Sequence, residues 1–155
     1  MEPRELDETL MRYVRPKSFP LAISLVGSEE EVPARARRPK RDFGWEMPTC
    51  QAMSIARRYG WTIAMSADDM MCTTSALGLG MVPAKSGFLD GRFAIPPWEE
   101  DQETRAKMIK LVPRLPYQED RILLMAPLAR ADFEPQVVSV YGDPAQVMML
   151  SLIHI

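Results

Sequence analysis

The chain contains the same strand-then-helix pattern twice, and this repeat is the strongest limit on the folds that it can adopt. Residues 20–27 read Pro-Leu-Ala-Ile-Ser-Leu-Val-Gly, and residues 135–142 read Pro-Gln-Val-Val-Ser-Val-Tyr-Gly. Each copy is followed by an expected helix start with a matching core, Gln51-Ala-Met53 in the first copy and Gln146-Val-Met148 in the second. The repeat indicates one structural unit that is used twice.

Hydrophobic periodicity and helix-end signals predict an alternation of strands and helices along the chain. We expect strands over residues 21–26, 61–65, 121–126 and 136–141. We expect helices over residues 5–15, 48–59, 66–77 and 99–112 and from 143 onward, a long loop over 28–47 and an irregular stretch over 83–97. This order predicts an α/β or α+β fold in which helices flank a mixed sheet, with two related strand–helix units of which the second is truncated.

The spacing of apolar residues also predicts which helix faces turn toward the core. In the helix over 5–15 these residues are Leu6, Leu10, Tyr13 and Val14. In the helix over 48–59 they are Ala52, Ile55, Ala56 and Tyr59.

The last six residues change what can be counted as natural sequence. The bases CTG TCT CTT ATA CAC ATC, a transposon-adapter end used in sequencing libraries, would encode Leu-Ser-Leu-Ile-His-Ile, which is the sequence of residues 150–155. We therefore expect residues 150–155 to be translated adapter and residues 1–149 to form a single incomplete domain; the alternative is a natural amphipathic tail. If the adapter interpretation holds, His154, the only histidine, drops out together with every scheme that needs an imidazole.

Composition places the chain among soluble globular proteins. It has 155 residues, enough for one domain with a core, and is 46% hydrophobic and 26% charged. The formal net charge of −2 gives no overall attraction to nucleic acid or to anionic membranes. No apolar run approaches the roughly 20 residues that span a bilayer, and the polar N-terminus does not read as a signal peptide. We therefore expect a cytoplasmic protein whose two cysteines are reduced thiols.

The two cysteines are the strongest candidates for functional side chains. Cys50 falls in the first turn of the helix expected over 48–59, where the helix dipole and unpaired backbone N–H groups favour a thiolate. Its alternative role is that of a small buried residue that packs the helix against the sheet. Cys72 is expected in the second turn of the helix over 66–77, where Asp68 and Asp69 would raise the pKa of its thiol.

Together the cysteines suggest a site for a cofactor or a metal ion. Their separation of 22 residues is compatible with two neighbouring helix starts that face one site. Gln51 and Gln146, at matching positions of the repeat, are further candidates for cofactor contacts. Zinc or an iron–sulfur cluster normally takes four protein ligands, so a metal held by Cys50 and Cys72 would need donors from missing sequence or from a second subunit.

A basic run lies in the expected loop over 28–47. Five cations occupy seven positions: Arg35, Arg37, Arg38, Lys40 and Arg41. Such a run can bind phosphates or RNA, but here it lacks the interleaved aromatic residues on which bases stack. A solvated loop is the favoured interpretation.

Several short segments of the sequence together resemble domain-of-unknown-function family 169, an uncharacterised prokaryotic family. The resemblance spans residues 16–149 and rests on Pro20-Leu-Ala-Ile, Cys50-Gln-Ala, Cys72 followed by Leu77-Gly78, Arg114-Leu-Pro116, Ala126-Pro-Leu128 and Asp143-Pro-Ala-Gln-Val-Met148. It implies a protein of bacteria or archaea, many of them anaerobes, with no established activity and with a Gly- and Cys-containing section beyond the second helix. It supports the two thiols as a site, and the basic insertion at 33–41 departs from the family pattern.

These observations lead to one preferred function and two alternatives. We expect a ligand- or cofactor-binding domain with a two-cysteine site, with a redox-linked role as one form of it. Its partners would be a small molecule or a metal ion, with a second copy of the chain as a further candidate, and no membrane. The alternatives are a non-catalytic structural or interaction domain with core cysteines, and weak nucleic-acid binding through residues 35–41. The residues do not decide whether the protein is an enzyme.

Overall fold

The computed structural model describes residues 2–92 and 101–152. Its strands are β1 (Leu21–Val26), β2 (Ile63–Met65), β3 (Ile122–Pro127) and β4 (Val137–Ser139). Its α-helices are α1 (Pro3–Tyr13), α2 (Thr49–Tyr59), α3 (Thr73–Gly78), α4 (Ser86–Leu89), α5 (Gln102–Leu111) and α6 (Pro144–Leu152). Short helical turns lie at η1 (Glu29–Glu31), η2 (Pro39–Phe43), η3 (Ala67–Asp69) and η4 (Leu128–Arg130).

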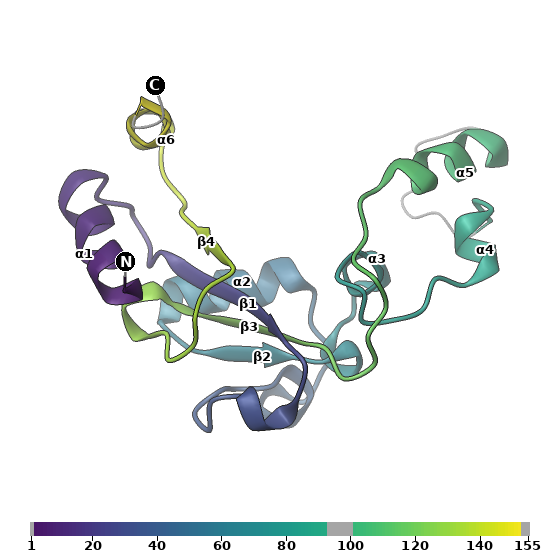
Figure 1. The fold of residues 1–155 in the computed structure, drawn as a ribbon, viewed down its shortest axis with the longest axis horizontal. Coiled ribbons are helices and arrows are strands. Elements are labelled where there is room, and N and C mark those ends of the chain that lie inside the picture. The colour runs from purple at the N-terminus through teal and green to yellow at the C-terminus, as the bar shows by residue number, and fades with distance from the viewer. Residues whose placement is uncertain (1, 93–100, 153–155) are drawn as a thin grey trace.

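The four strands form one sheet in the order β2-β3-β1-β4, and each neighbouring pair runs antiparallel (Figure 1). The α+β alternative is therefore confirmed. The mixed sheet expected from the sequence is limited to two isolated parallel bridges, Arg37–Ile63 and Met47–Met70, outside these ladders. The sequence alternation suggested neighbouring parallel strands. The strands β1 and β2, which α2 connects, do run in the same direction, but β3 lies between them and runs opposite to both, so each neighbouring pair is antiparallel.

Both faces of the sheet are covered, which explains why every residue of β3 is buried. On one face, α2 places Ala52 and Ala56 against Leu21 of β1 and Met125 of β3. On the other face, α1 and the segment around Ala36 cover a second set of strand residues, Ala22, Ala64, Ile122 and Leu124. Burying a large aliphatic side chain contributes about 1.5–3 kcal/mol, so these two layers supply most of the driving force for folding.

The repeated strands are neighbours in the sheet. Equivalent residues of the two copies are 115 positions apart in the chain, and β1 pairs with β4 through Ala22–Val138 and Ile23–Val137. With this offset, Ala22 in the first copy is equivalent to Val137 in the second, and Ile23 is equivalent to Val138. Exchanging the two copies therefore converts the pair Ala22–Val138 into the pair Val137–Ile23. A local two-fold axis between these pairs therefore relates the two copies.

The segment over 28–47 is ordered by helical turns rather than forming one long loop. Pro39 begins η2, and Gly44 ends it in the left-handed conformation with φ of 83°. The backbone N–H of Arg38 donates to the Asp42 carboxylate at 2.6 Å, which satisfies a donor that the turn leaves free. The expected absence of helix in this segment is therefore wrong, because side-chain caps support turns that its prolines alone would not predict.

The two tyrosines that were expected on inner helix faces lie outside. Tyr13 is 58% exposed at the end of α1, and Tyr59 is 65% exposed at the end of α2. Leu10, Val14, Ala52 and Ala56 are buried as expected. Because Leu10 and Ala56 in the same last turns are buried, the core-facing side of each helix is narrower than its apolar stripe and excludes the tyrosine.

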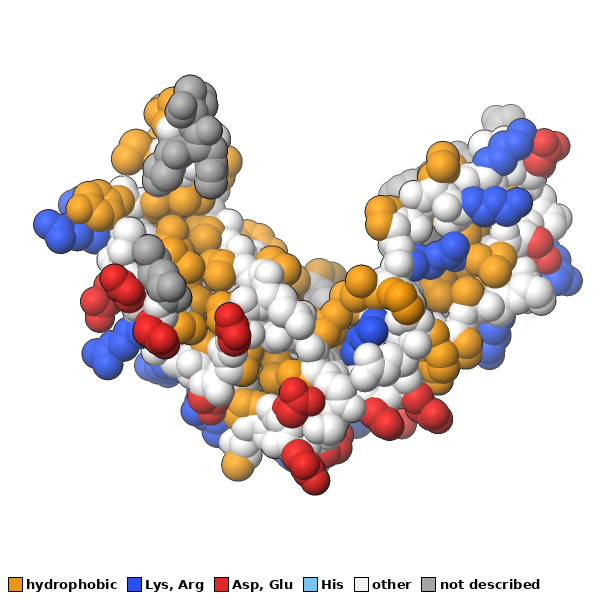
Figure 2. All heavy atoms as spheres, viewed as in Figure 1, with side chains coloured by type: hydrophobic (Ala, Val, Ile, Leu, Met, Phe, Trp, Pro, Cys, Tyr) orange, Lys and Arg blue, Asp and Glu red, His pale blue; other side chains and the backbone are white. Residues whose placement is uncertain are grey.

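Two parts of the molecule project from the sheet. Figure 1 shows α6 at one end and the α4–α5 pair at the other, and Figure 2 shows hydrophobic side chains continuing onto the α6 projection. The exposed apolar residues of α6 are Val147, Met148, Met149 and Leu152. Over residues 2–92 and 101–152, every helix is too short or too polar to cross a membrane.

Candidate functional site

Two helices begin side by side at one end of the sheet. The Met47 N–H donates to the Asp69 carbonyl at 2.9 Å, and the Met71 N–H donates to the Met47 carbonyl at 3.2 Å. This parallel bridge aligns the segment that enters α2 with the segment that enters α3. The expectation that the two cysteine-bearing segments meet at neighbouring helix starts thus has a backbone basis.

Cys50 is the second residue of α2, and its side chain is exposed. The alternative in which Cys50 packs α2 against the sheet is therefore wrong. The core contacts of α2 come instead from Ala52 and Ala56, one turn further along. An exposed thiol at a helix start is available to solutes.

Cys72 is the N-cap residue of α3 and not part of the second turn of a longer helix. The helix expected over 66–77 is interrupted because Met70 takes an extended conformation and pairs with Met47. Ser66 and Asp69 form a capping box at the start of the expected helix, but the helical turn that it begins, η3, ends at Asp69. The side chain of Cys72 is partly exposed.

The electrostatic environment of Cys72 is opposite to the one expected. Hydrogen bonds from the hydroxyl and then the backbone N–H of Ser75 lower the pKa of the Cys72 thiol, with a smaller contribution from the Thr74 N–H and an opposing one from burial. Asp69 does not raise this pKa, because its carboxylate accepts from Ser66 and from the Lys40 N–H. The local geometry therefore favours a thiolate at Cys72.

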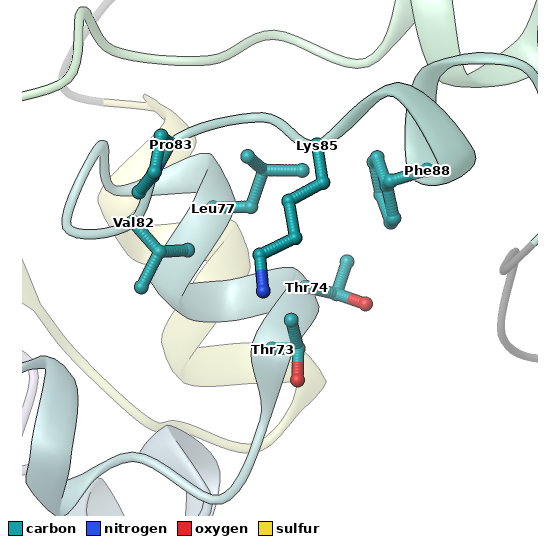
Figure 3. A pocket seen from close by; sticks show the side chains of 7 residues that line it. All are labelled: Thr73, Thr74, Leu77, Val82, Pro83, Lys85 and Phe88. Carbon is teal, nitrogen blue, oxygen red and sulfur yellow. The ribbon is translucent and has the colours of Figure 1, made fainter.

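A cavity of about 450 Å³ opens directly beside this helix start, between α3 and α4. Figure 3 shows its lining, with the aliphatic chain of Lys85 lying between Leu77 and Phe88 and its amino group directed toward the first turn of α3. The remaining lining residues are Thr73, Thr74, Val82 and Pro83. The walls are mainly apolar, and the polar groups are one ammonium and two hydroxyls, which suits a small apolar molecule with an acidic group.

Sequence reasoning missed this cavity. Lys85 and Phe88 lie in the stretch over 83–97 that was expected to be irregular, and the short helix α4 that carries Phe88 has only four residues. Residues 93–97 of that stretch lie outside the described residues. No periodic signal is available in four residues, so only the packing of α4 near α3 reveals the pocket.

The structure does not gather all four candidate residues at one place. Gln51 is exposed in the first turn of α2, close to Cys50 in sequence. Gln146 instead serves the cap of α6: its Oε1 accepts from the Asp143 N–H at 2.8 Å, and its Nε2 donates to the Arg15 carbonyl.

The α6 cap lies toward the opposite end of α2. The Asp143 carboxylate is 3.5 Å from Lys17 Nζ, and the neighbouring Phe19 N–H donates to the carbonyl of Arg57 in the last turn of α2. An 11-residue helix spans about 16 Å, so Gln51 and Gln146 lie toward different ends of α2 despite their matching sequence positions.

The two thiols do not complete a metal centre by themselves. Within residues 2–92 and 101–152, no group of three or more His, Cys, Asp or Glu side chains is placed to hold a metal ion. His154 lies outside the described residues. A metal ion at Cys50 and Cys72 would need donors beyond this part of the chain.

The basic run is largely matched by partners within the protein. Arg35 pairs with Asp132 at 2.9 Å, Arg38 pairs with Glu29 and Asp69, Lys40 pairs with Glu46 at 3.1 Å, and Arg41 pairs with Asp42 at 2.8 Å. Arg37 lies over the Trp61 ring, with its guanidinium carbon 3.7 Å from the ring centroid. Binding a nucleic-acid phosphate here would compete with these contacts, which weakens that alternative.

Comparison with known proteins adds a family but no activity. A family model described as "Uncharacterised ArCR" matches residues 9–154, which covers most of the chain. No curated protein and no solved structure matches.

Proposed function

This chain belongs to that family, DUF169, and on this premise we propose that it is a ligand-binding domain whose pocket lies between α3 and α4, beside the Cys72 thiol. The proposal rests on the position of an apolar cavity of about 450 Å³. The cavity is lined from Thr73 onward, and the residue before Thr73 is Cys72, whose thiol has a lowered pKa. Cys72 is not one of the lining residues, but because it directly precedes Thr73, we expect a bound ligand to limit access to the Cys72 thiol.

The ligand is a small organic anion. Leu77, Val82 and Phe88 would contact its apolar part, which supplies the larger share of the binding free energy. The Lys85 ammonium would pair with its acidic group and fix its orientation. Lys85 has no ion-pair partner among the described residues, so pairing with a ligand breaks no contact that the structure shows.

The thiols give this proposal a direct test with 1-naphthoate as the probe. In Cys50→Ser protein, naphthoate should slow the alkylation of Cys72 by iodoacetamide, because the ligand covers the neighbouring thiol. In Cys72→Ser protein, naphthoate should leave the alkylation of Cys50 unchanged. Equal protection of both cysteines, or of neither, would contradict a pocket beside Cys72.

The cation in the pocket gives a second readout. Lys85→Met removes the charge but keeps an apolar side chain, and it should weaken naphthoate binding by roughly two- to fivefold, as expected for one exposed ion pair. Lys107→Met is the matched control, because Lys107 is exposed on α5 and pairs only with Glu103 within that helix. Equal affinities of the two variants would contradict the role of Lys85.

The second candidate function uses both thiols. The parallel bridge between Met47 and Met70 brings the two cysteine-bearing helix starts alongside each other, which supports a two-thiol site for zinc or an iron–sulfur cluster completed by other donors. Anaerobically purified protein should then contain zinc or iron that is lost in both Cys50→Ser and Cys72→Ser. Metal content that does not depend on either cysteine would count against it.

A further inference from the structure

A second cavity lies at the other end of α2 and has no part in the function proposed above. It measures about 300 Å³ and lies between the segment Pro16–Phe19 and the last turn of α2. Its polar lining consists of Lys17, Ser18, Arg57 and Arg58. We propose that this cavity binds the phosphoryl group of a small phosphate monoester.

The walls of the cavity are held in place before any ligand binds. Arg15 turns the chain with a positive φ of 54°, and its carbonyl accepts a hydrogen bond from Gln146 Nε2. Two residues beyond the buried Pro16, the Arg57 side chain donates to the Ser18 hydroxyl at 3.3 Å. The Phe19 N–H donates to the Arg57 carbonyl at 3.1 Å. The segment is thus fixed at both ends, and little conformational entropy is lost on binding.

The charge of the site suits a dianion. Lys17 is paired with Asp143 at 3.5 Å, while Arg57 and Arg58 have no carboxylate partner among the described residues. The C-terminal end of a helix contributes the equivalent of about half a negative charge, which leaves a net charge of about +1.5 at the cavity. A phosphate monoester carries −1.5 to −2 at neutral pH and matches this value more closely than a carboxylate does.

The Arg57 guanidinium is oriented to donate. Its central carbon lies 4.2 Å from the centroid of the Tyr141 ring. A guanidinium stacked on an aromatic ring keeps its N–H donors in its own plane, at the edge of the stack. Arg57 Nε is buried with no hydrogen-bond partner among the described residues, and an oxyanion in the adjoining cavity would supply an acceptor.

An apolar wall beside the cations defines the rest of the ligand. Met11 and Phe19 line the cavity and are 46% and 41% exposed. An aromatic or alkyl group attached to the phosphate would cover these side chains. The ligand class is therefore a phosphate monoester with a small apolar group, for which phenyl phosphate is a suitable probe.

Isothermal titration of the full chain at constant ionic strength tests this proposal. Phenyl phosphate should bind more tightly than both inorganic phosphate, which lacks the apolar group, and benzoate, which lacks the second charge. Arg58→Gln should weaken phenyl phosphate binding by about tenfold, the effect of losing one charge-assisted contact. Arg4→Gln is the matched control, because Arg4 lies at the start of α1 and pairs with Glu8 within that helix.

Amide chemical shifts locate the probe independently of the variants. Phenyl phosphate should shift the amides of residues 17–19 and 57–58 in the wild-type chain. Shifts confined to residues 73–88 would overturn the proposal and assign the probe to the α3–α4 pocket. It would also be overturned by benzoate binding as tightly as phenyl phosphate, or by Arg58→Gln and Arg4→Gln showing the same affinity.

Discussion

Asp69 and Cys72 are three positions apart, yet they do not influence each other as their sequence distance suggests. The Asp69 side chain is buried, and its oxygens accept from the Ser66 backbone, the Ser66 hydroxyl and the Lys40 backbone at 3.0–3.1 Å, with Arg38 at 3.4 Å. Cys72 is the N-cap residue of a different helix, α3, where the Ser75 hydroxyl and backbone N–H lower the pKa of its thiol. The direction of a pKa shift depends on which groups surround the side chain. Positions in sequence predict those groups only where the residues belong to one continuous helix.

Ser75→Ala tests the cause of the lowered pKa of Cys72. A lowered pKa raises the thiolate fraction near neutral pH, so Cys72 should be alkylated at lower pH than an ordinary thiol. Removing the Ser75 hydroxyl should raise this pKa and shift the pH profile of alkylation to higher pH. Rates measured with iodoacetamide in Cys50→Ser protein give the profile.

The control for this measurement is Ser54→Ala, which removes a hydroxyl from α2 instead. Its profile should match that of the parent. An unchanged profile in Ser75→Ala, or a shift to lower pH, would show that the Ser75 hydroxyl does not stabilise the thiolate.

At the scale of elements, the sequence predicts best where local signals and burial agree. The bounds of β1 are those expected, since a buried apolar run between Pro20 and Gly27 leaves little choice. The start of α6 at Pro144 also agrees with the helix expected from residue 143 onward: the Gln146 N–H donates to Asp143 Oδ1 at 3.0 Å and lowers the pKa of that carboxyl. The segment over 28–47 was predicted less well, because its turns depend on partners distant in sequence, such as Asp69 and Trp61.

The connection after α3 depends on one glycine. Gly80 has φ of +69°, and a Cβ there would lie 2.3 Å from the Pro116 carbonyl oxygen, so an alanine would be both strained and in collision. Gly80→Ala should lower the free energy of unfolding by at least about 2 kcal/mol. Chemical denaturation checks this value.

Gly78→Ala is the matched control for that substitution. Gly78 ends α3, and a Cβ there meets nothing within 4 Å. Alanine should stabilise the helix by up to about 1 kcal/mol. Equal effects of the two substitutions would contradict the close approach of Gly80 to the segment near Pro116.

At the scale of the whole molecule, the repeat and the α+β class were predictable, but the assembly of the candidate site was not. Equivalent positions such as Gln51 and Gln146 suggested a shared site, whereas the two-fold relation of β1 and β4 carries the helix starts apart. The α3–α4 pocket is built by α4 and the segment around Lys85, which have no counterpart in the repeat. The use of Gln51 and Gln146 in cofactor binding stays a prediction.

The apolar face of α6 predicts self-association. Val147, Met148, Met149 and Leu152 are each about half exposed, and none of the residues of α6 through Leu152 is buried. Replacing Met148 and Leu152 by Gln should reduce concentration-dependent association in sedimentation velocity. Met108→Gln on α5, where the side chain is 46% exposed, should leave association unchanged. Association that persists in the α6 variant would place the contact elsewhere.

The pairing of β1 with β4 also bears on how the two copies meet. Two identical units related by a two-fold axis through paired strand edges have the geometry of an isologous dimer. Joining two such units in one chain makes their encounter intramolecular and independent of concentration, whereas separate copies would have to meet in solution. Among the described residues the two copies now differ in their surroundings: β1 is an interior strand between β3 and β4, whereas β4 has a neighbouring strand on one side only.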